Sequence, residues 1–228
     1  MQIPRHIGAL SEKLGYSFHH TERLQRALTH RSFSSEHNER LEFLGDSILD
    51  CVISRYLFDS FPHLSEGELS RLRSSLVREE TLATLARRLG LGECLQLGEG
   101  ELRSGGRERA STLADALEAV FGAVFMDGGF EDAGKAILGL YVPYLGEIDI
   151  ATLGKDPKTL LQEYLQGKKI PLPVYNVIAT HGEAHAQSFQ VECAIPALKM
   201  VTQGTGTSRR SAEQQAAEAA YRQLTGRP

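Results

Sequence analysis

The sequence predicts a mostly α protein, in which an all-helical domain over residues 1–150 is followed by a small α-β-β-β-α domain over residues 155–225. In the first 150 residues, apolar side chains recur every three or four positions, as on the buried face of an amphipathic helix. After Glu147, proline-marked segments and short runs of β-branched and aromatic residues are typical of strands. The net charge is −7 up to residue 154 and +3 from Lys155 onward. We therefore expect two domains with different partners.

Helices are expected in seven segments of the first domain, and several of their ends are marked. Gly90 and the pair Gly128–Gly129 follow helical patterns and are expected where helices stop. Ser65 and Ser111 precede helices and are expected as N-caps. Residues 98–106 are too rich in glycine for a helix, so we expect an exposed loop there. The expected helices cover residues 7–14, 21–28, 38–58, 67–77, 80–89, 111–126 and 130–144.

The second domain is expected to begin with a helix over residues 158–166, introduced by Asp156 as N-cap and Pro157 in the first turn. A hairpin-like segment, residues 181–187, separates the first two of three strands. Five alanines between positions 212 and 220 should let a final helix pack closely on the sheet. The strands are expected at 174–180, 188–194 and 198–203, and the final helix at 209–224.

Composition argues against several classes of protein. With 41% hydrophobic and 24% charged residues, the chain is typical of a globular protein. The longest apolar run, residues 119–126, is far shorter than the roughly 20 residues of a membrane-spanning helix. The first ten residues have no long apolar segment behind basic residues, so we expect no secretory signal. Three widely spaced cysteines argue against a disulfide framework and a cysteine zinc site, and they favour the cytoplasm.

Six carboxylates stand out because they share helix faces inside otherwise apolar segments. At 100° per residue, acids spaced i, i+3 and i+7 fall within an arc of about 60° on one helix. The acids are Glu39, Glu42 and Asp46 at this spacing, Asp115 and Glu118 at i and i+3 on another helix, and Glu66 before a third.

These acids form either an ordinary solvated helix surface, which the spacing alone favours, or a metal site. Their apolar surroundings place them near a packed interior, where carboxylates about 6 Å apart repel by roughly 3 kcal/mol at an effective dielectric constant near 20. A hard divalent cation with oxygen ligands is the usual way to offset this repulsion. His30 and His37 are expected to form local hydrogen bonds rather than to bind zinc, so magnesium is the favoured ion.

The run NERLEFLGDSIL, residues 38–49, resembles the signature of the ribonuclease III family, endoribonucleases specific for double-stranded RNA. The blocks SEGELSRLRSSLV and GELRSGGRERASTLADALEAVFGAVFMDGG resemble the same family in the same order. Towards the C-terminus, DPKTLLQEYLQ, PLPVY, GEAHAQSFQVEC and GTGTSRRSAEQQAAEAAYRQL resemble a double-stranded RNA-binding domain. The resemblance covers nearly the whole chain and implies a catalytic domain over 1–150 and an RNA-binding domain over 155–225.

The resemblance implies hydrolysis of double-stranded RNA that depends on magnesium, with manganese as a substitute, and uses no organic cofactor. The products would carry 5′-phosphate and 3′-hydroxyl ends with short 3′ overhangs. Asp46 and Glu118 match the acids most closely tied to catalysis, and Glu39 and Glu66 match outer acids of the same cleft. The metal-binding acids of the family match Glu42, Asp46, Asp115 and Glu118.

Ser208, Arg209 and Arg210 open the final helix behind a glycine-containing turn. Backbone N–H groups, the helix dipole and two guanidinium groups would then converge on one phosphate-sized site. Taken alone, this segment is more typical of a capped surface helix. Together with the rest of the domain, it favours RNA binding.

Three further residues are expected to contact RNA. Gln162 and Glu163 on the first helix of this domain, and His185 between the first two strands, would reach a minor-groove edge or a 2′-hydroxyl. The family often carries more lysines on this final helix, whereas Gln214 and Gln215 follow the arginine pair here, which predicts modest affinity.

The predicted function is therefore a cytoplasmic endoribonuclease, with implied roles in the processing of ribosomal, transfer and messenger RNA. A double-stranded RNA-binding protein that does not cleave is the alternative. A metal phosphohydrolase acting on small nucleotides would leave the second domain unexplained.

Because antiparallel strands are related by a local two-fold axis, a C2 homodimer with two sites is expected. The segment from Gly98 to Arg109 is not a Walker A sequence; it either lines the nuclease cleft or only connects helices.

Overall fold

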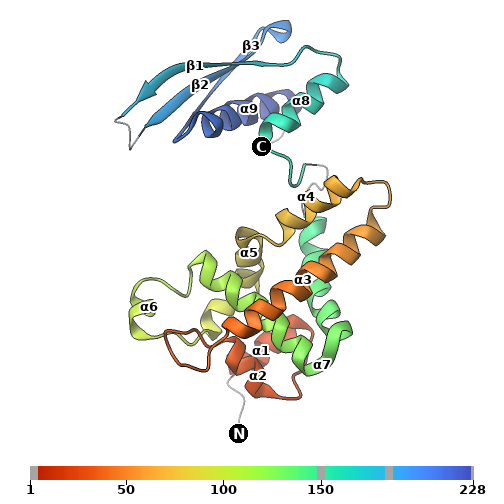
Figure 1. The fold of residues 1–228 in the computed structure, drawn as a ribbon, viewed down its shortest axis with the longest axis vertical. Helices are drawn as coiled ribbons and strands as arrows, with labels where there is room; N and C mark the ends of the chain where they lie inside the picture. Colours follow the sequence, from red (N-terminus) through yellow and green to blue (C-terminus); the bar gives the residue numbers. More distant parts are fainter. Residues whose placement is uncertain (1–4, 148–151, 183–186, 227–228) are drawn as a thin grey trace. The chain divides into compact units, whose positions relative to one another are not determined.

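The computed structural model describes residues 5–147, 152–182 and 187–226. The chain forms two compact units, residues 1–153 and 154–228 (Figure 1). The first unit is helical and the second is a three-stranded sheet with helices, which confirms the predicted fold class. None of the described helices is long and apolar enough to cross a membrane.

The helices of the first unit follow the expected order, with one addition. Residues 98–106 were expected as a loop, but Glu99–Arg103 forms a short helix, so this prediction was wrong. Gly98 precedes the helix in an extended conformation, and an ion pair of 3.0 Å between Arg103 and Glu99 spans its single turn. The helices are α1 (Arg5–Leu14), α2 (Thr21–Ala27), α3 (Glu39–Ser60), α4 (Glu66–Leu76), α5 (Glu79–Leu89), α6 (Glu99–Arg103) and α7 (Ala110–Gly146), with a 3-10 turn at Leu91–Cys94.

The predicted helix ends were partly correct. Gly90 ends α5 in the left-handed conformation, with φ of 74°. Ser65 begins α4, where its N–H and hydroxyl groups donate to the Glu68 carboxylate at 2.8 and 2.7 Å. Ser111 is not an N-cap, because α7 already begins at Ala110. The two helices expected on either side of Gly128–Gly129 form the single element α7, which is interrupted at Gly129 with φ of 80° and ψ of −173°.

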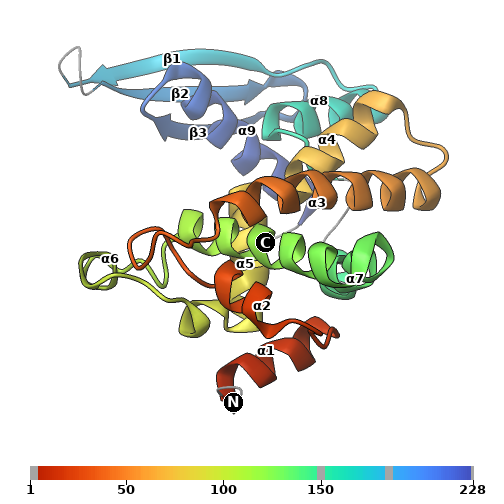
Figure 2. The same ribbon diagram turned by 60° about the horizontal axis from the view of Figure 1, so that its bottom comes forward.

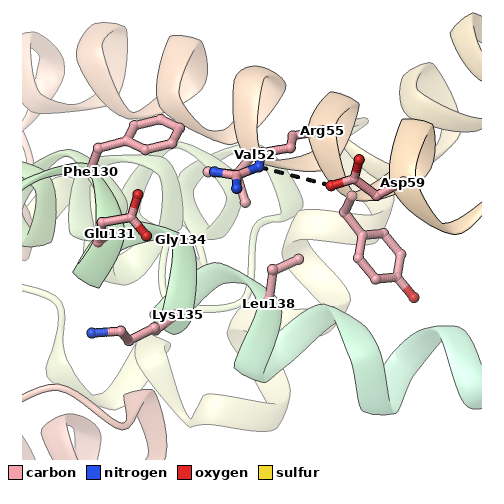
Figure 3. A pocket seen from close by; sticks show the side chains of 9 residues that line it. Val52, Arg55, Asp59, Phe130, Glu131, Gly134, Lys135 and Leu138 are labelled. Atoms are coloured by element: carbon pink, nitrogen blue, oxygen red, sulfur yellow. Dashed lines mark ion pairs between the residues drawn. The ribbon is translucent and has the colours of Figure 1, made fainter.

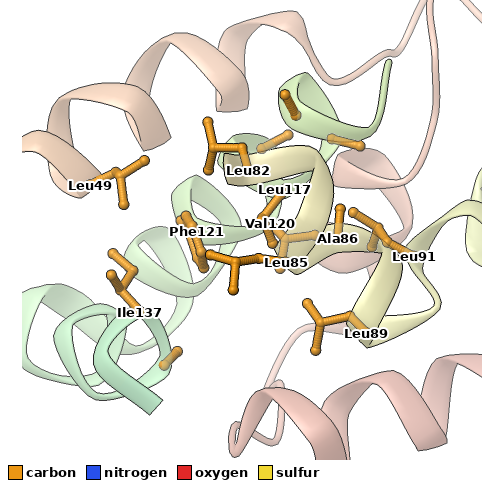
Figure 4. Close-up of a cluster of buried hydrophobic side chains, with 14 of the residues drawn as sticks. Leu49, Leu82, Leu85, Ala86, Leu89, Leu91, Leu117, Val120, Phe121 and Ile137 are labelled. Atoms are coloured by element: carbon orange, nitrogen blue, oxygen red, sulfur yellow. The ribbon is translucent and has the colours of Figure 1, made fainter. Parts of the chain in front are cut away.

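The core of the first unit lies between α3, α5 and α7. Figure 4 shows Leu49 of α3 and Leu82 of α5 directed toward the same cluster as Phe121 of α7. These side chains are at most 1% exposed. Their burial, at about 25 cal/mol per Å² of apolar surface, is the main contribution that stabilises the unit.

The backbones of α3 and α7 approach each other very closely at two glycines (Figures 1 and 2). A Cβ atom on Gly45 would lie 1.8 Å from the carbonyl oxygen of Glu118, and one on Gly122 would lie 2.2 Å from that of Leu41. Real Cβ atoms essentially never come this close, so no larger residue fits at either position without separating the helices. Both glycines are buried.

The second unit has the expected α-β-β-β-α order, with both helices on one face of the sheet (Figure 1). Asp156 caps the first helix by accepting the N–H of Thr159 at 3.0 Å, and Pro157 is its first residue, as predicted. The third strand begins two residues later than expected, because residues 196–198 form a 3-10 turn. The elements are α8 (Pro157–Gly167), β1 (Val174–His181), β2 (Ser188–Ile195), β3 (Met200–Gly206) and α9 (Arg209–Thr225).

The strands pair antiparallel in the order β1-β2-β3, with an irregularity between Val177 and Ala179. Helix α9 packs closely on β3, since a Cβ atom on Gly204 would lie 2.3 Å from the backbone nitrogen of Ala216. Four of the five alanines expected to allow this packing are buried, and Ala219 is partly exposed. The buried alanines are Ala212, Ala216, Ala217 and Ala220.

We expect Gly45→Ala to lower the free energy of unfolding of the first unit by about 1–3 kcal/mol or more, because the added methyl group must push α3 away from α7. Gly139→Ala on α7 is the control, because a Cβ atom there would meet nothing within 4 Å. That change should be neutral or stabilising by up to about 1 kcal/mol. Urea denaturation followed by circular dichroism measures both. Equal stability of the two variants would contradict the close crossing.

Candidate functional site

Three of the predicted acids come together where α3 crosses α7. Glu42 projects from α3, and Asp115 and Glu118 project from α7. Each offers a carboxylate oxygen, and these oxygens all lie within 4.8 Å of one another. The crossing at Gly45 and Gly122 makes this possible, since acids on two helices separated by ordinary side chains would lie farther apart. We call Glu42, Asp115 and Glu118 the acidic cluster.

In the acidic cluster, burial and repulsion between the carboxylates outweigh the attraction of nearby Arg31. Burial, together with the neighbouring charges of Asp46 and Asp115, raises the pKa of Glu118 to about 8. Burial and the charge of Asp115 also raise the pKa of Glu42. Such shifts mark groups whose charged form is stabilised only by something outside the protein, such as a cation.

Asp46 lies beside the acidic cluster but is not one of the three closest acids. It is exposed on α3, and its charge contributes to the raised pKa of Glu118. Burial and the charge of Asp50 raise the pKa of Asp46 itself. Asp50 was not predicted as part of the site. It stands one helical turn after Asp46, a spacing that extends the stripe of acids and could have identified it.

An open pocket of about 560 Å³ lies against the acidic cluster and includes Glu42 and Asp115 in its wall. Glu39 lines the same pocket, where Arg31 donates to its carboxylate at 3.2 Å. Arg109 and Glu101, which pair with each other, line another part of it. Of the two alternatives for the segment from Gly98 to Arg109, the structure therefore supports the one in which it lines the cleft. The guanidinium groups of Arg31 and Arg109 place positive charge beside the acids. Neither arginine was predicted as part of the site.

Glu66 lies apart from the acidic cluster within one chain. It begins α4, where its carboxylate accepts a hydrogen bond of 3.0 Å from Ser70. It lines an apolar groove of about 700 Å³ formed by α3 and α4, together with Leu57, Phe58 and Leu69. The expectation that Glu66 belongs to the same cleft remains a prediction.

The donor set of the acidic cluster fits a hard divalent cation. All three groups are carboxylates, and magnesium and manganese prefer oxygen ligands of this kind. His30 and His37 form the local hydrogen bonds that were expected. Ser32 Oγ lies 2.8 Å from His30 Nδ1, and the N–H of Glu39 donates to His37 Nδ1 at 3.4 Å. Among the described residues, no histidine or cysteine joins this group.

A further pocket of about 300 Å³ lies between α3 and α7, away from every predicted site residue (Figure 3). Arg55 and Asp59 face each other across 3.9 Å in its wall, and Lys135 lies on the opposite side. Its charges are mixed, and no buried polar group is directed into it among the residues drawn.

In the second unit, the predicted phosphate site at the start of α9 is only partly free. The hydroxyl of Ser208 accepts the N–H of Ser211 at 3.1 Å, so it caps the helix. Arg209 donates to Glu213 at 2.9 Å, one turn along the same helix. Arg210 is exposed and forms no hydrogen bond or ion pair within the described parts of the chain. Of the three side chains predicted at this site, Arg210 thus has the most freedom to contact a phosphate.

The other predicted RNA contacts lie on α8 or outside the described residues. Gln162 is half-buried and Glu163 is exposed, and Lys155 pairs with Glu163 at 2.7 Å. His185 falls in residues 183–186, outside the part of the chain that the structure describes.

Gln214 and Gln215, on the helix where the family often carries more lysines, have structural partners. The Gln214 side chain accepts the N–H of Lys158 at 3.0 Å and so satisfies the start of α8. Gln215 accepts the N–H and the hydroxyl of Thr205 at the end of β3.

Comparison with known proteins gives matches over both units. Residues 21–145 match the Ribonuclease-III-like family, and residues 157–224 match the double-stranded RNA binding motif. Ribonuclease 3 of Cupriavidus pinatubonensis is 60% identical over 94% of this chain and 84% of its own length. Ribonuclease 3 of Thiobacillus denitrificans is 56% identical over 94% of this chain and 95% of its own length. The crystal structure of the nuclease domain of the Campylobacter jejuni enzyme is 44% identical, with a TM-score of 0.61, over 64% of this chain and 100% of that chain.

We expect Glu118→Gln to stabilise the metal-free protein, and to do so more at pH 8 than at pH 5. A carboxyl whose pKa rises on folding destabilises the fold in its charged form. The stability lost through Glu118 therefore grows as the pH rises from its ordinary pKa of 4.5 through about 8. Melting temperatures in EDTA at the two pH values measure the gain. Glu12→Gln on α1, an exposed acid, is the control. A gain that is equal at both pH values would contradict the repulsion at the cluster.

Proposed function

The chain belongs to the ribonuclease III family of endoribonucleases, and we propose that it cleaves double-stranded RNA with a magnesium or manganese ion held by Glu42, Asp46, Asp115 and Glu118. The observation that carries the proposal is the group of three carboxylate oxygens within 4.8 Å of one another. A group of this kind holds a divalent ion through few protein ligands and leaves positions for water and phosphate oxygens.

When bound, such an ion lowers the pKa of a water molecule and stabilises the charge on the phosphate and on the leaving 3′ oxygen. The protein fixes the positions of its own carboxylates through the crossing of α3 and α7. Asp46 and Glu118 are the acids proposed as catalytic. Hydrolysis at the 3′ oxygen leaves 5′-phosphate and 3′-hydroxyl ends. Glu39 and Glu66 are proposed to support the cleft, and Arg31 and Arg109 bring positive charge to a site that would otherwise repel RNA.

The double-stranded RNA binding motif in residues 157–224 supports duplex RNA as the substrate. Domains of this kind read the A-form shape over about 16 base pairs and bind with little sequence preference. We propose that RNA contacts come from Ser208, Arg209 and Arg210 at the start of α9, from Gln162 and Glu163 on α8, and from His185. Processing of ribosomal, transfer and messenger RNA precursors is the corresponding proposed role.

A homodimer is proposed because the described residues of one chain hold one acidic cluster, whereas the two strands of a duplex are related by a local two-fold axis. Two phenylalanines of α3 favour a partner surface there, since Phe43 is 78% and Phe58 is 71% exposed. Phe58 also lines the apolar groove that contains Glu66. A second structure of the Campylobacter jejuni nuclease domain, 46% identical with a TM-score of 0.58, is described as flexible in a region involved in dimer formation.

We expect Glu118→Gln to abolish cleavage of duplex RNA and to leave duplex binding intact. Loss of one ligand charge should remove about 3 kcal/mol or more of transition-state stabilisation, which is a hundredfold or greater loss of rate. Single-turnover cleavage of a labelled duplex in magnesium measures the rate, and a gel-shift assay in calcium measures binding. Glu12→Gln should cleave like the wild-type protein. Comparable cleavage by the Glu118→Gln variant would contradict the assignment of the acids.

Replacing Arg209 and Arg210 together by alanine should weaken binding to all duplex sequences alike. The slope of log affinity against log salt should fall by about one to two, the number of lost phosphate contacts. Arg210→Ala alone should give most of the effect, because Arg209 already pairs with Glu213. Arg222→Ala, at the other end of α9 and paired with Glu218, is the matched control. A sequence-dependent loss would contradict recognition through phosphates.

Phe43→Glu should convert the protein to a monomer, because dimer formation would bury the new carboxylate in the proposed interface without a partner. Sedimentation velocity measures the mass, with Val142→Glu, an exposed apolar position at the end of α7, as the control. In addition, dimers that combine one wild-type chain with one Glu118→Gln chain should nick a single strand. A monomeric mass for the active wild-type protein, or cleavage of both strands by a verified mixed dimer, would contradict the proposal.

A further inference from the structure

His30 lines the pocket beside the acidic cluster, and its ring is held in place from one side. The backbone N–H of Ser32 donates to His30 Nδ1 at 3.2 Å, and Ser32 Oγ lies 2.8 Å from the same nitrogen. Ser32 Oγ itself accepts the N–H of Gly98 at 2.9 Å. Ser32 Oγ therefore lies within hydrogen-bond distance of both Gly98 and His30.

These contacts fix which ring nitrogen of His30 carries the proton. A backbone N–H only donates, so Nδ1 must present its lone pair to Ser32. The proton of the neutral ring is then on Nε2. Among the described residues, His30 Nε2 forms no hydrogen bond. The ring is thus a fixed donor that has no acceptor within the described chain.

The backbone around His30 has little freedom to move. The N–H of His30 donates to Gln96 at 3.0 Å, and the N–H of Gln96 donates to Leu28 at 2.8 Å. A Cβ atom on Gly98 would lie 2.3 Å from the carbonyl oxygen of Ser32, so the two loops are in direct backbone contact. Residues 28–32, which include His30, and residues 96–98 are therefore joined by backbone contacts that limit the movement of His30.

The other residues of the pocket indicate which acceptor fits this donor. Glu42 and Asp115 lie in the same wall, and the pocket opens to solvent. A phosphate group that approaches these acids needs donors for its non-bridging oxygens, since carboxylates supply none. Arg31 and Arg109 in the same pocket already pair with Glu39 and Glu101, whereas the Nε2–H of His30 has no acceptor among the described residues.

We propose that His30 is a further residue of the proposed cleavage reaction: its Nε2–H donates a hydrogen bond to a non-bridging oxygen of the RNA phosphate bound at the acidic cluster. Ser32 acts as a positioning residue, because it sets the tautomer and the orientation of the ring. This inference rests on the proposed function, since it needs a phosphodiester at the acidic cluster.

The test compares His30→Ala, His30→Gln and His30→Asn in single-turnover cleavage of a duplex RNA in magnesium. Removing one preorganised donor from an active site costs about a hundredfold or more in rate. We expect this loss for the Ala and Asn variants. The Gln variant should recover most of the rate, because its amide reaches the position of Nε2 whereas that of Asn reaches only the position of Nδ1. His19→Ala, an exposed histidine before α2, is the matched control and should cleave like the wild-type protein.

Two further measurements separate a phosphate contact from a structural role. Melting temperature, its increase on adding magnesium, and duplex affinity in calcium should be unchanged in the His30 variants. A phosphorothioate at the scissile position should slow the wild-type protein and slow His30→Ala less, since the variant has already lost the contact with that oxygen.

The inference is overturned if His30→Ala cleaves within about twofold of the wild-type rate, or if the Gln variant is no faster than the Asn variant. Strictly additive effects of the phosphorothioate and the substitution would also overturn it. If the wild-type protein itself fails to cleave duplex RNA, the proposed function fails instead, so the two failures are distinguishable.

Discussion

At the crossing of α3 and α7, no side chain separates the two helix backbones. Gly45 faces the carbonyl oxygen of Glu118, and Gly122 faces that of Leu41. This contact places the acid that precedes Gly45 by one turn, Glu42, within reach of Asp115 and Glu118 on the other helix. The pocket, the raised pKa of Glu118 and the proposed metal site all depend on it. The apolar side chains packed between α3, α5 and α7 supply the stability that holds repelling carboxylates together.

Two carboxylates of the same helix show how surroundings decide what an acid does. Asp127 of α7 has a fully buried side chain, yet its pKa lies below the ordinary value, because hydrogen-bond donors outweigh the effect of burial. Its role is to tie the loop between α1 and α2 to the middle of α7. Glu118, two and a half turns earlier, has acids for neighbours and a pKa of about 8. The donors to Asp127 are the N–H groups of His19 and His20, the hydroxyl of Tyr16 and the guanidinium of Arg23. A carboxylate with such donors stabilises the fold, whereas one without them is available for a cation.

Helical periodicity was sufficient to predict the fold class and most helices, because the apolar stripes of α3, α5 and α7 dominate their sequences. Spacing on one helix is a local property and drew attention to the acids, but it favoured an ordinary helix surface, and the family resemblance was needed to predict a metal site. The short helix α6 was missed because a five-residue helix in a glycine-rich segment has no periodicity to detect. Arg31 and Arg109 were missed for a different reason. Their position beside the acids depends on contacts between loops that are far apart in the sequence, as does the hydrogen bond from Gly98 to Ser32.

The second unit shows why net charge alone overstates how strongly a domain attracts RNA. Of the positive groups near the start of α9, Arg209 and Lys158 both pair with Glu213, and Lys158 also lies 4.4 Å from the centre of the Tyr175 ring. Pairing of both charges with Glu213 reduces the number of phosphates they can neutralise. Gln214 and Gln215 satisfy backbone and side-chain groups of α8 and β3, so replacing them by lysine would cost structural hydrogen bonds. We therefore expect duplex binding by this unit to depend on the fit of the domain to the A-form helix more than on charge.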